Sequence, residues 1–168
     1  MIPRELVDRV RSGFALPHDS IHGWAHWARV LENGFRLAAD TGAHAEVVEL
    51  FSLLHDCKRL SDQTDLGHGR RAAEFARSQR GLCILLSDED FELLAFACEY
   101  HTDGLVEANV TVQTCWDADR LDLGRVGILP EPGRLCTAAA KELGVLKWAI
   151  RRSQEHGVVR LDAECFRG

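Results

Sequence analysis

Apolar residues recur at helical spacing along most of the chain, and no long run alternates apolar and polar residues as a half-buried strand does. Leu6, Val7, Val10 and Phe14, for example, share one face of a helix. The pattern predicts helices over residues 4–14, 21–39, 43–57, from 67 onward, from 87 to 101, from 110 onward and 134–156. The expected fold is therefore all-α, one compact bundle of about six to eight helices.

Capping residues and glycines mark where several of these helices should begin and end. Asp19 and Ser20 are suitable N-caps for the second helix, and Gly42 marks its expected end. Residues 87–90, Ser-Asp-Glu-Asp, open the fifth helix with acidic groups, which the helix dipole favours there. Gly144 is the weak point of the last helix, for which we expect only a packing role.

Length and composition indicate a single domain over residues 1–168. A chain of 168 residues is long enough to bury a sizeable core. Its hydrophobic fraction of 46% and charged fraction of 27% are ordinary for a soluble globular protein, which supports that assignment. The formal net charge of −6 argues against general nucleic-acid binding, although Lys and Arg can still gather around an anionic substrate.

Neither the cysteines nor the N-terminus indicates an exported or membrane-bound protein. No cysteine belongs to a C-x-x-C pair, and the six stand in apolar surroundings at positions 57, 83, 98, 115, 136 and 165. We therefore expect reduced and mostly buried thiols. The first residues contain no apolar signal core, and no apolar run approaches the ~20 residues of a membrane span. The expected location is the cytoplasm.

The apolar segment from Val47 to Leu54 ends in the adjacent residues His55 and Asp56. A helix this apolar is expected to be buried, so both polar groups should lie at the edge of a core. An imidazole and a carboxylate in such a place cost folding free energy unless each has a partner. A bound metal ion is one partner that would offset this cost.

Other histidines and acids stand at helical spacing. His22 and His26 are four residues apart and share a helix face, which Arg29 joins. The alternative is that one histidine of the pair is a satisfied interior group and the other is exposed. Asp119 and Asp122 are one helical turn apart, and they indicate either a solvated acidic face or a partly buried site. Both pairs therefore supply candidate metal ligands.

The donor types narrow the choice of metal. Imidazole and carboxylate donors together suit Mn, Fe, Co, Ni or Zn, whereas Mg alone prefers an all-oxygen environment. A set made of a histidine, the His-Asp pair and a later aspartate would leave positions open for water, as catalytic sites do. The expected cofactor is a divalent metal ion, one of Mn, Fe, Co, Ni, Zn or Mg.

Three segments resemble the HD-domain metal-dependent phosphohydrolase superfamily. Residues 22–30, HGWAHWARV, resemble its first helix, residues 53–56, LLHD, its His-Asp pair, and residues 118–121, ADRL, its final aspartate segment. The resemblance covers about residues 18–128 and implies an all-helical, HD-domain-like fold. The ligands that it implies are His26, His55, Asp56 and Asp119. Asp117 is the alternative last ligand, or orients a ligand from behind.

The resemblance also suggests a role for two further histidines. Residues 67–73, GHGRRAA, and residues 99–104, EYHTDG, resemble segments that supply ligands to a second metal in some family members. In a two-metal site, His68 and His101 would be ligands and Asp56 would bridge the ions. In a one-metal site, both histidines would line the pocket and contact a substrate phosphate.

The activity that the resemblance implies is hydrolysis of a small phosphate ester or nucleotide by a metal-activated water. The expected catalytic residues are Asp56, Arg29, Lys58 and His68. The expected ligands of the substrate phosphate are Arg29, Lys58, Arg59 and His101. Further candidates are Arg70 and Arg120 as cations, and Asp62, Asp65 and His68 as the general acid. For each cation, the alternative is a plain surface position.

Two departures from the family limit the choice of substrate. Residues 57–59, Cys-Lys-Arg, stand where the alarmone hydrolases have paired acids, and the Gly-Tyr-Pro extension of the cyclic-dinucleotide phosphodiesterases is missing. Two alternative functions stay open. One is a di-iron oxygenase with four histidine and two aspartate ligands, and the other is a regulatory module that binds metal or nucleotide with little turnover. Assembly as a homodimer also stays open.

Overall fold

The computed structural model describes residues 2–155, which form eight α-helices, two short 3₁₀ helices and no strand. The helices are α1 Arg4–Gly13, α2 Trp24–Thr41, α3 Ala45–Leu54, α4 His68–Gln79, α5 Asp88–Tyr100, α6 Val110–Arg120, α7 Ala138–Lys141 and α8 Leu143–Gln154. The 3₁₀ helices are η1 Leu123–Val126 and η2 Pro132–Arg134. The all-α fold expected from the sequence is confirmed.

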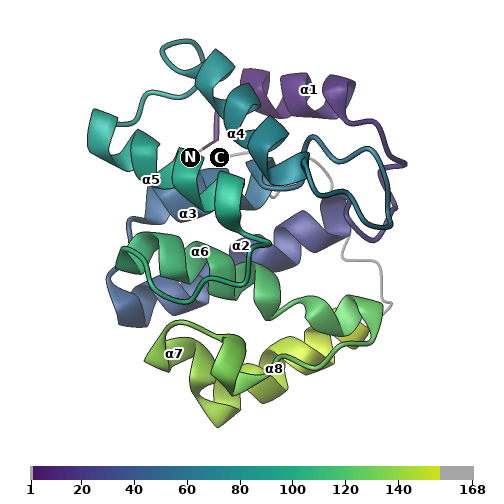
Figure 1. Cartoon of the computed structure of the whole chain (residues 1–168), viewed down its shortest axis with the longest axis vertical. Coiled ribbons are helices and arrows are strands. Elements are labelled where there is room, and N and C mark those ends of the chain that lie inside the picture. The colour runs from purple at the N-terminus through teal and green to yellow at the C-terminus, as the bar shows by residue number, and fades with distance from the viewer. Residues whose placement is uncertain (1, 156–168) are drawn as a thin grey trace.

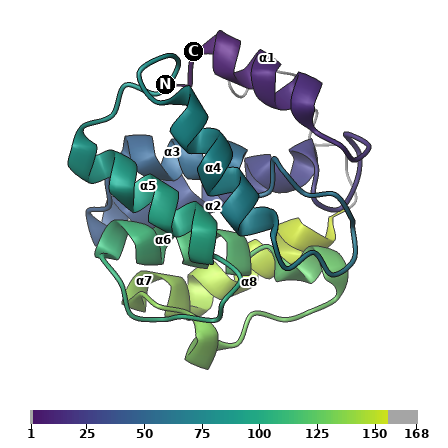
Figure 2. The same ribbon diagram turned by 45° about the horizontal axis from the view of Figure 1, so that its top comes forward.

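Helices α2 and α3 occupy the middle of the molecule. α2 packs against α3 and α6, α3 also packs against α5, and α4 and α5 form the most extensive helix pair. Figure 1 shows α1 and α4 on one side of this middle layer and α7 and α8 on the other. The turned view in Figure 2 shows the same order, with α4, α5 and α6 in front of α2 and α3.

The apolar run before His55 is the centre of the main core. Val47, Phe51, Leu53 and Leu54 are all fully buried, as predicted for this helix. A second, smaller core lies between α2, the end of α6, α7 and α8, and its buried members are Leu37, Leu121, Leu135, Ala140, Val145, Leu146 and Ala149. The end of α6 therefore packs on both cores, because Ala118 belongs to the main core and Leu121 to the second.

The second helix begins later than the sequence predicted. α2 starts at Trp24 after Gly23, because residues 18–23 form a compact turn in which Trp24 N–H donates to His18 O (3.2 Å). Ser20 caps this turn by accepting from His22 N–H (3.2 Å) and does not cap the helix. A Cβ at position 23 would lie 2.3 Å from His18 O, so the turn requires glycine there.

The predicted helix over residues 134–156 is wrong as one element. The segment divides into η2, α7 and α8, and the chain is extended at Glu142 while Gly144 lies in the first turn of α8. Buried Asp117 causes part of this division, because its carboxylate accepts from Cys136 N–H (2.7 Å) and Thr137 N–H (2.8 Å). Those donors are therefore held in a loop. Residue 156 lies outside the described residues.

The cysteines in the described part of the chain are free thiols, as expected. Cys57, Cys83, Cys98 and Cys115 are buried and Cys136 is partly exposed, while Cys165 lies outside the described residues. Burial raises the pKa of the Cys57 thiol to about 12, which keeps it protonated and unreactive. No described helix combines the length and apolar character needed to cross a membrane.

Candidate metal centre

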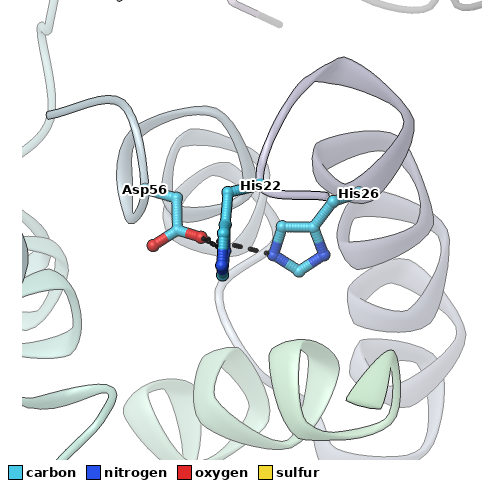
Figure 3. A group of neighbouring side chains, drawn as sticks. All are labelled: His22, His26 and Asp56. Carbon is cyan, nitrogen blue, oxygen red and sulfur yellow. Dashed lines mark hydrogen bonds and ion pairs between the residues drawn. The ribbon is translucent and has the colours of Figure 1, made fainter. Parts of the chain in front are cut away.

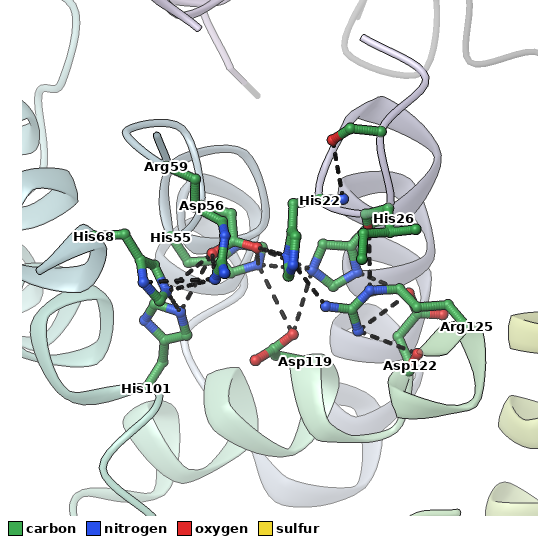
Figure 4. Close-up of polar contacts among 12 residues, drawn as sticks. His22, His26, His55, Asp56, Arg59, His68, His101, Asp119, Asp122 and Arg125 are labelled. Atoms are coloured by element: carbon green, nitrogen blue, oxygen red, sulfur yellow. Dashed lines mark hydrogen bonds and ion pairs between the residues drawn. The ribbon is translucent and has the colours of Figure 1, made fainter. Parts of the chain in front are cut away.

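Five segments that are far apart in the sequence bring four histidines and two aspartates together (Figure 4). We call these residues the metal-ligand cluster: His26, His55, Asp56, His68, His101 and Asp119. His26 lies on α2, the His55-Asp56 pair lies in the turn after α3, and Asp119 lies in the last turn of α6. His68 is the first residue of α4, and His101 follows the last residue of α5. The ends of helices therefore supply most of the cluster.

The first group consists of His26, His55, Asp56 and Asp119. His26 Nε2 lies 3.0 Å from His55 Nε2 and 3.3 Å from Asp119 Oδ1. Asp56 Oδ2 lies 3.7 Å from His26 Nε2 and 3.8 Å from His55 Nε2. Ligand atoms about 2.0–2.2 Å from one ion stand about 3.0–3.6 Å apart, so these four residues can hold an ion with small adjustments.

The second group consists of Asp56, His68 and His101. The Nε2 atoms of His68 and His101 lie 2.9 Å apart, and they are 3.1 Å and 3.5 Å from Asp56 Oδ1. The two oxygens of Asp56 thus face different groups of imidazoles. Asp56 Oδ1 is buried and has no hydrogen-bond partner among the described residues. Such an oxygen is costly unless a cation or a donor meets it.

The protons of the four imidazoles lie on the nitrogens that face away from the centre. Each Nδ1 contacts an oxygen that can only accept, so each Nδ1 must donate. In the order His26, His55, His68 and His101, the acceptors are Asp122 Oδ2 (2.7 Å), Phe51 O (3.1 Å), Asp65 O and Cys98 O (2.8 Å). In neutral imidazoles the Nε2 lone pairs then face one another at about 3 Å. A metal ion between them would turn this repulsion into coordination.

Charges in the cluster follow from burial and mutual contact. Burial lowers the pKa of His55 to about 3, so this imidazole is neutral at physiological pH. Burial alone would raise the pKa of Asp56 and of Asp119, but contacts with the surrounding imidazoles hold both well below the ordinary value. Burial alone would lower the pKa of His101, but its contact with Asp56 raises it. A neutral imidazole such as His55 beside ionised carboxylates suits a divalent ion.

Asp122 positions His26 from behind, and sequence reasoning missed this role. Its carboxylate accepts from His26 Nδ1 and forms a two-pronged ion pair with Arg29, through Nε (2.6 Å) and Nη2 (3.0 Å). Burial alone would raise the pKa of Asp122, but these two partners lower it. Arg125 Nη1 donates to Asp122 O (3.2 Å) and its Nε to Ile21 O (2.9 Å). The one-turn spacing from Asp119 was the available signal.

His22 is buried next to Asp56 (Figure 3). Its Nδ1 lies 2.8 Å from Asp56 Oδ2, on the side of that carboxylate that also faces His26. The alternative in which one histidine of the 22/26 pair is exposed is wrong, because both are buried. His22, His26 and Asp56 can also bring three ligand atoms together, so His22 joins the site although it lies before α2.

The predicted cations differ in whether they reach the metal-ligand cluster. Arg59 reaches the cluster, with Nη1 3.6 Å from Asp56 Oδ1, whereas Arg29 reaches it only through Asp122. Lys58 does not reach it, because its Nζ lies 3.4 Å from Gly13 O and 4.1 Å from the centre of the Phe75 ring. These contacts give no support to the expected catalytic and phosphate-binding role of Lys58, which stays a prediction.

The remaining predicted residues do not reach the cluster, and most of them bind other parts of the chain. Arg70 is an exposed partner of Glu74, and Arg120 donates to the carbonyl oxygens of Leu105 and Arg134. Asp117 accepts from residues 136 and 137, so Asp119 is the aspartate of α6 that faces the imidazoles. Asp65 binds Arg71 and the backbone of residue 60, and Asp62 is exposed in the same loop.

Comparison with known proteins agrees with the architecture. A crystal structure of a predicted HD superfamily hydrolase from an uncultured Thermotogales bacterium superposes with a TM-score of 0.66. The match covers 89% of this chain and 83% of that chain at 24% sequence identity. No protein-family model and no curated protein matches the sequence. The chain therefore has the helical fold of a predicted HD superfamily hydrolase, with buried His/Asp clusters suited to a metal.

Proposed function

We propose that this chain is a metal-dependent phosphohydrolase of the HD superfamily, acting on a small phosphate ester or nucleotide. One observation carries the proposal: four imidazoles direct Nε2 lone pairs at one another and at both oxygens of Asp56. Neutral histidines fixed by Nδ1–H donation are the form that binds divalent ions. The fold shared with a predicted HD superfamily hydrolase supports the same conclusion.

The first group would hold the ion that the reaction needs. A divalent ion held by His26, His55, Asp56 and Asp119 would activate a water molecule and neutralise phosphate oxygens. Of these four side chains, Asp119 is the most exposed, at 17%, whereas the other three are buried. Water and substrate should therefore approach from the side of Asp119.

Residues around the first group prepare it for this task. Asp122 and Arg29 hold the His26 ring in one orientation and keep its proton on Nδ1. His22 lies beside Asp56 Oδ2 and stabilises the charge of that carboxylate. Arg59, one of the predicted phosphate ligands, reaches the cluster beside the second group, at Asp56 Oδ1, and is expected to attract the anionic group of a substrate.

Metal analysis combined with a phosphatase screen tests the proposal. The purified protein should contain a divalent metal and should release phosphate from small phosphate esters or nucleotides with Mn, Co, Ni or Mg. His55→Ala and Asp56→Ala should each lower the rate at least about a hundredfold. His44→Ala is the matched control, because His44 pairs with Asp90 on the surface. This variant should keep full activity. Full activity and metal content in the first two variants would disprove the proposal.

The donor set also fits a di-iron oxygenase, since four histidines and two aspartates do come together. That function predicts bound iron with a visible charge-transfer band and oxygen consumption, in place of phosphate release. A regulatory module would instead bind a nucleotide, and gain thermal stability from it, without turnover. Measuring phosphate release, oxygen consumption and thermal stability on the same purified protein distinguishes the three functions.

A further inference from the structure

Arg59 is a buried arginine whose guanidinium is fixed by the backbone of the loop that it opens. Its Nε donates to Ser61 O (3.2 Å) and its Nη2 to Gln63 O (2.7 Å), and only 7% of the residue is exposed. These two bonds leave Nη1 as the nitrogen that faces the cluster (Figure 4). The position of this charge is therefore set by the loop and not by a flexible surface side chain.

The charge of Arg59 lies beside the second group without using its lone pairs. Nη1 is 3.2 Å from His68 Nε2 and 3.5 Å from His68 Nδ1. Such similar distances place Nη1 over the face of the imidazole, because an atom in line with the Nε2 lone pair would be much farther from Nδ1. Nη1 also lies 3.6 Å from Asp56 Oδ1, the oxygen that faces His68 and His101.

We infer that Arg59 sets the metal stoichiometry, so that the protein binds one ion tightly at the first group and a second only weakly. This inference rests on the proposed metal-dependent function. A guanidinium is always charged, and here it already neutralises part of the charge on Asp56 Oδ1. A second divalent ion on the same oxygen would meet this fixed positive charge in a buried setting, where repulsion is strong. In the described part of the chain, no lysine or arginine pairs with Asp56 Oδ2 or Asp119: Arg29 and Arg125 bind Asp122, and Arg125 Nη2 lies 3.5 Å from His22 Nδ1.

Titration of the metal-free protein with MnCl₂ tests this inference through calorimetry and electron paramagnetic resonance. The wild-type protein should bind one ion, and a second with an affinity at least about tenfold lower. Arg59→Gln removes the charge and should tighten the second ion by about tenfold or more, with the spin-coupled signal of a manganese pair at two equivalents. Arg59→Lys also loses the bonds to the loop but retains a charge, so it should resemble wild type.

Arg70→Gln is the matched control, because it removes an equal charge from an exposed arginine two residues after His68. It should leave both affinities unchanged, and thermal unfolding of each variant reports whether it is folded. Two equally tight ions in the wild-type protein would overturn the inference while leaving the proposed function intact. Equal effects of Arg59→Gln and Arg59→Lys would overturn it as well, because loop damage would then be the cause. No metal binding by any variant would overturn both proposals.

Discussion

At the scale of single residues, the decisive feature is which nitrogen of each imidazole carries the proton. Carbonyl oxygens of Phe51 and Cys98 fix the protons of His55 and His101, and the carboxylate of Asp122 fixes that of His26. The Nε2 atoms of these rings are left to face the carboxylates. This orientation prepares the site for a metal before any metal arrives.

His55 should remain a neutral Nδ1–H tautomer in the metal-free protein from about pH 7 down to about pH 5. Its pKa is lowered from 6.5 to about 3, so only the unfolded chain takes up a proton as the pH falls through that window. This residue therefore makes the fold less stable as the pH falls below 6.5. Long-range ¹H–¹⁵N spectra report the tautomer directly. Protonation of His55 near pH 6 in the folded protein would contradict this prediction.

Asp122→Asn should weaken metal binding by about 10- to 100-fold without unfolding the protein. The variant loses the ion pair with Arg29 and the fixed acceptor for His26 Nδ1, although it keeps all of the cluster residues. Competition with a chelator measures the affinity. Glu74→Gln, which breaks only an exposed pair with Arg70, is the control and should bind metal as wild type does. An unchanged affinity in Asp122→Asn would show that His26 needs no partner behind it.

At the scale of elements, close approach of α4 and α5 brings His68 and His101 together. Gly69 allows this contact, because a Cβ there would lie 2.6 Å from Glu99 O and 2.7 Å from Cys98 O. Cys98 O is also the acceptor that orients His101. The packing of two helices and the geometry of the second group thus depend on one missing side chain.

Gly69→Ala should destabilise the protein by about 1–3 kcal/mol, since the backbone of α5 must move to admit the methyl group. The shift would also separate His68 from His101. Denaturant unfolding measures the stability. Gly144→Ala is the matched control: nothing lies within 4 Å of a Cβ there, and alanine should stabilise α8 by about 0.5–1 kcal/mol. Equal effects of both substitutions would mean that Gly69 has no special packing role.

At the scale of the whole molecule, the cluster joins α2, α4, α5, α6 and the turn after α3 at one point. His26 and Asp119 are far apart in the sequence, yet His26 Nε2 and Asp119 Oδ1 lie 3.3 Å apart there. A ligand that binds only the assembled cluster stabilises the folded state of the entire chain. Metal binding and global stability should therefore be coupled.

A divalent metal at about 100 times its dissociation constant should raise the melting temperature by about 5–10 °C, and EDTA should reverse the shift. Differential scanning calorimetry measures it. Asp119→Asn removes a ligand of the first group and should show a smaller shift. Asp8→Asn is the control: Asp8 is exposed on α1, so the variant should keep the full shift in melting temperature. A melting temperature that is indifferent to metal and chelator would argue against an ion at this site.

Local patterns in the sequence predicted the all-α fold, the buried helix before His55 and the residues that meet in the cluster. They failed where a distant contact decides the backbone. Asp117 holds residues 136 and 137 in a loop and divides the expected last helix, and Gly23 lets a compact turn replace the expected first turn of α2. Neither contact leaves a periodic signal in its own segment.

The sequence by itself determined which helices form and which donor groups are present, because helical spacing and burial of apolar residues are local properties of the chain. Only the tertiary structure decided how those donors are used. It directed Arg59 toward Asp56 and its neighbour Lys58 toward Gly13, and it placed Asp122 behind His26. The physical reason is that the direction and partners of a side chain depend on packing between segments nearly 100 residues apart.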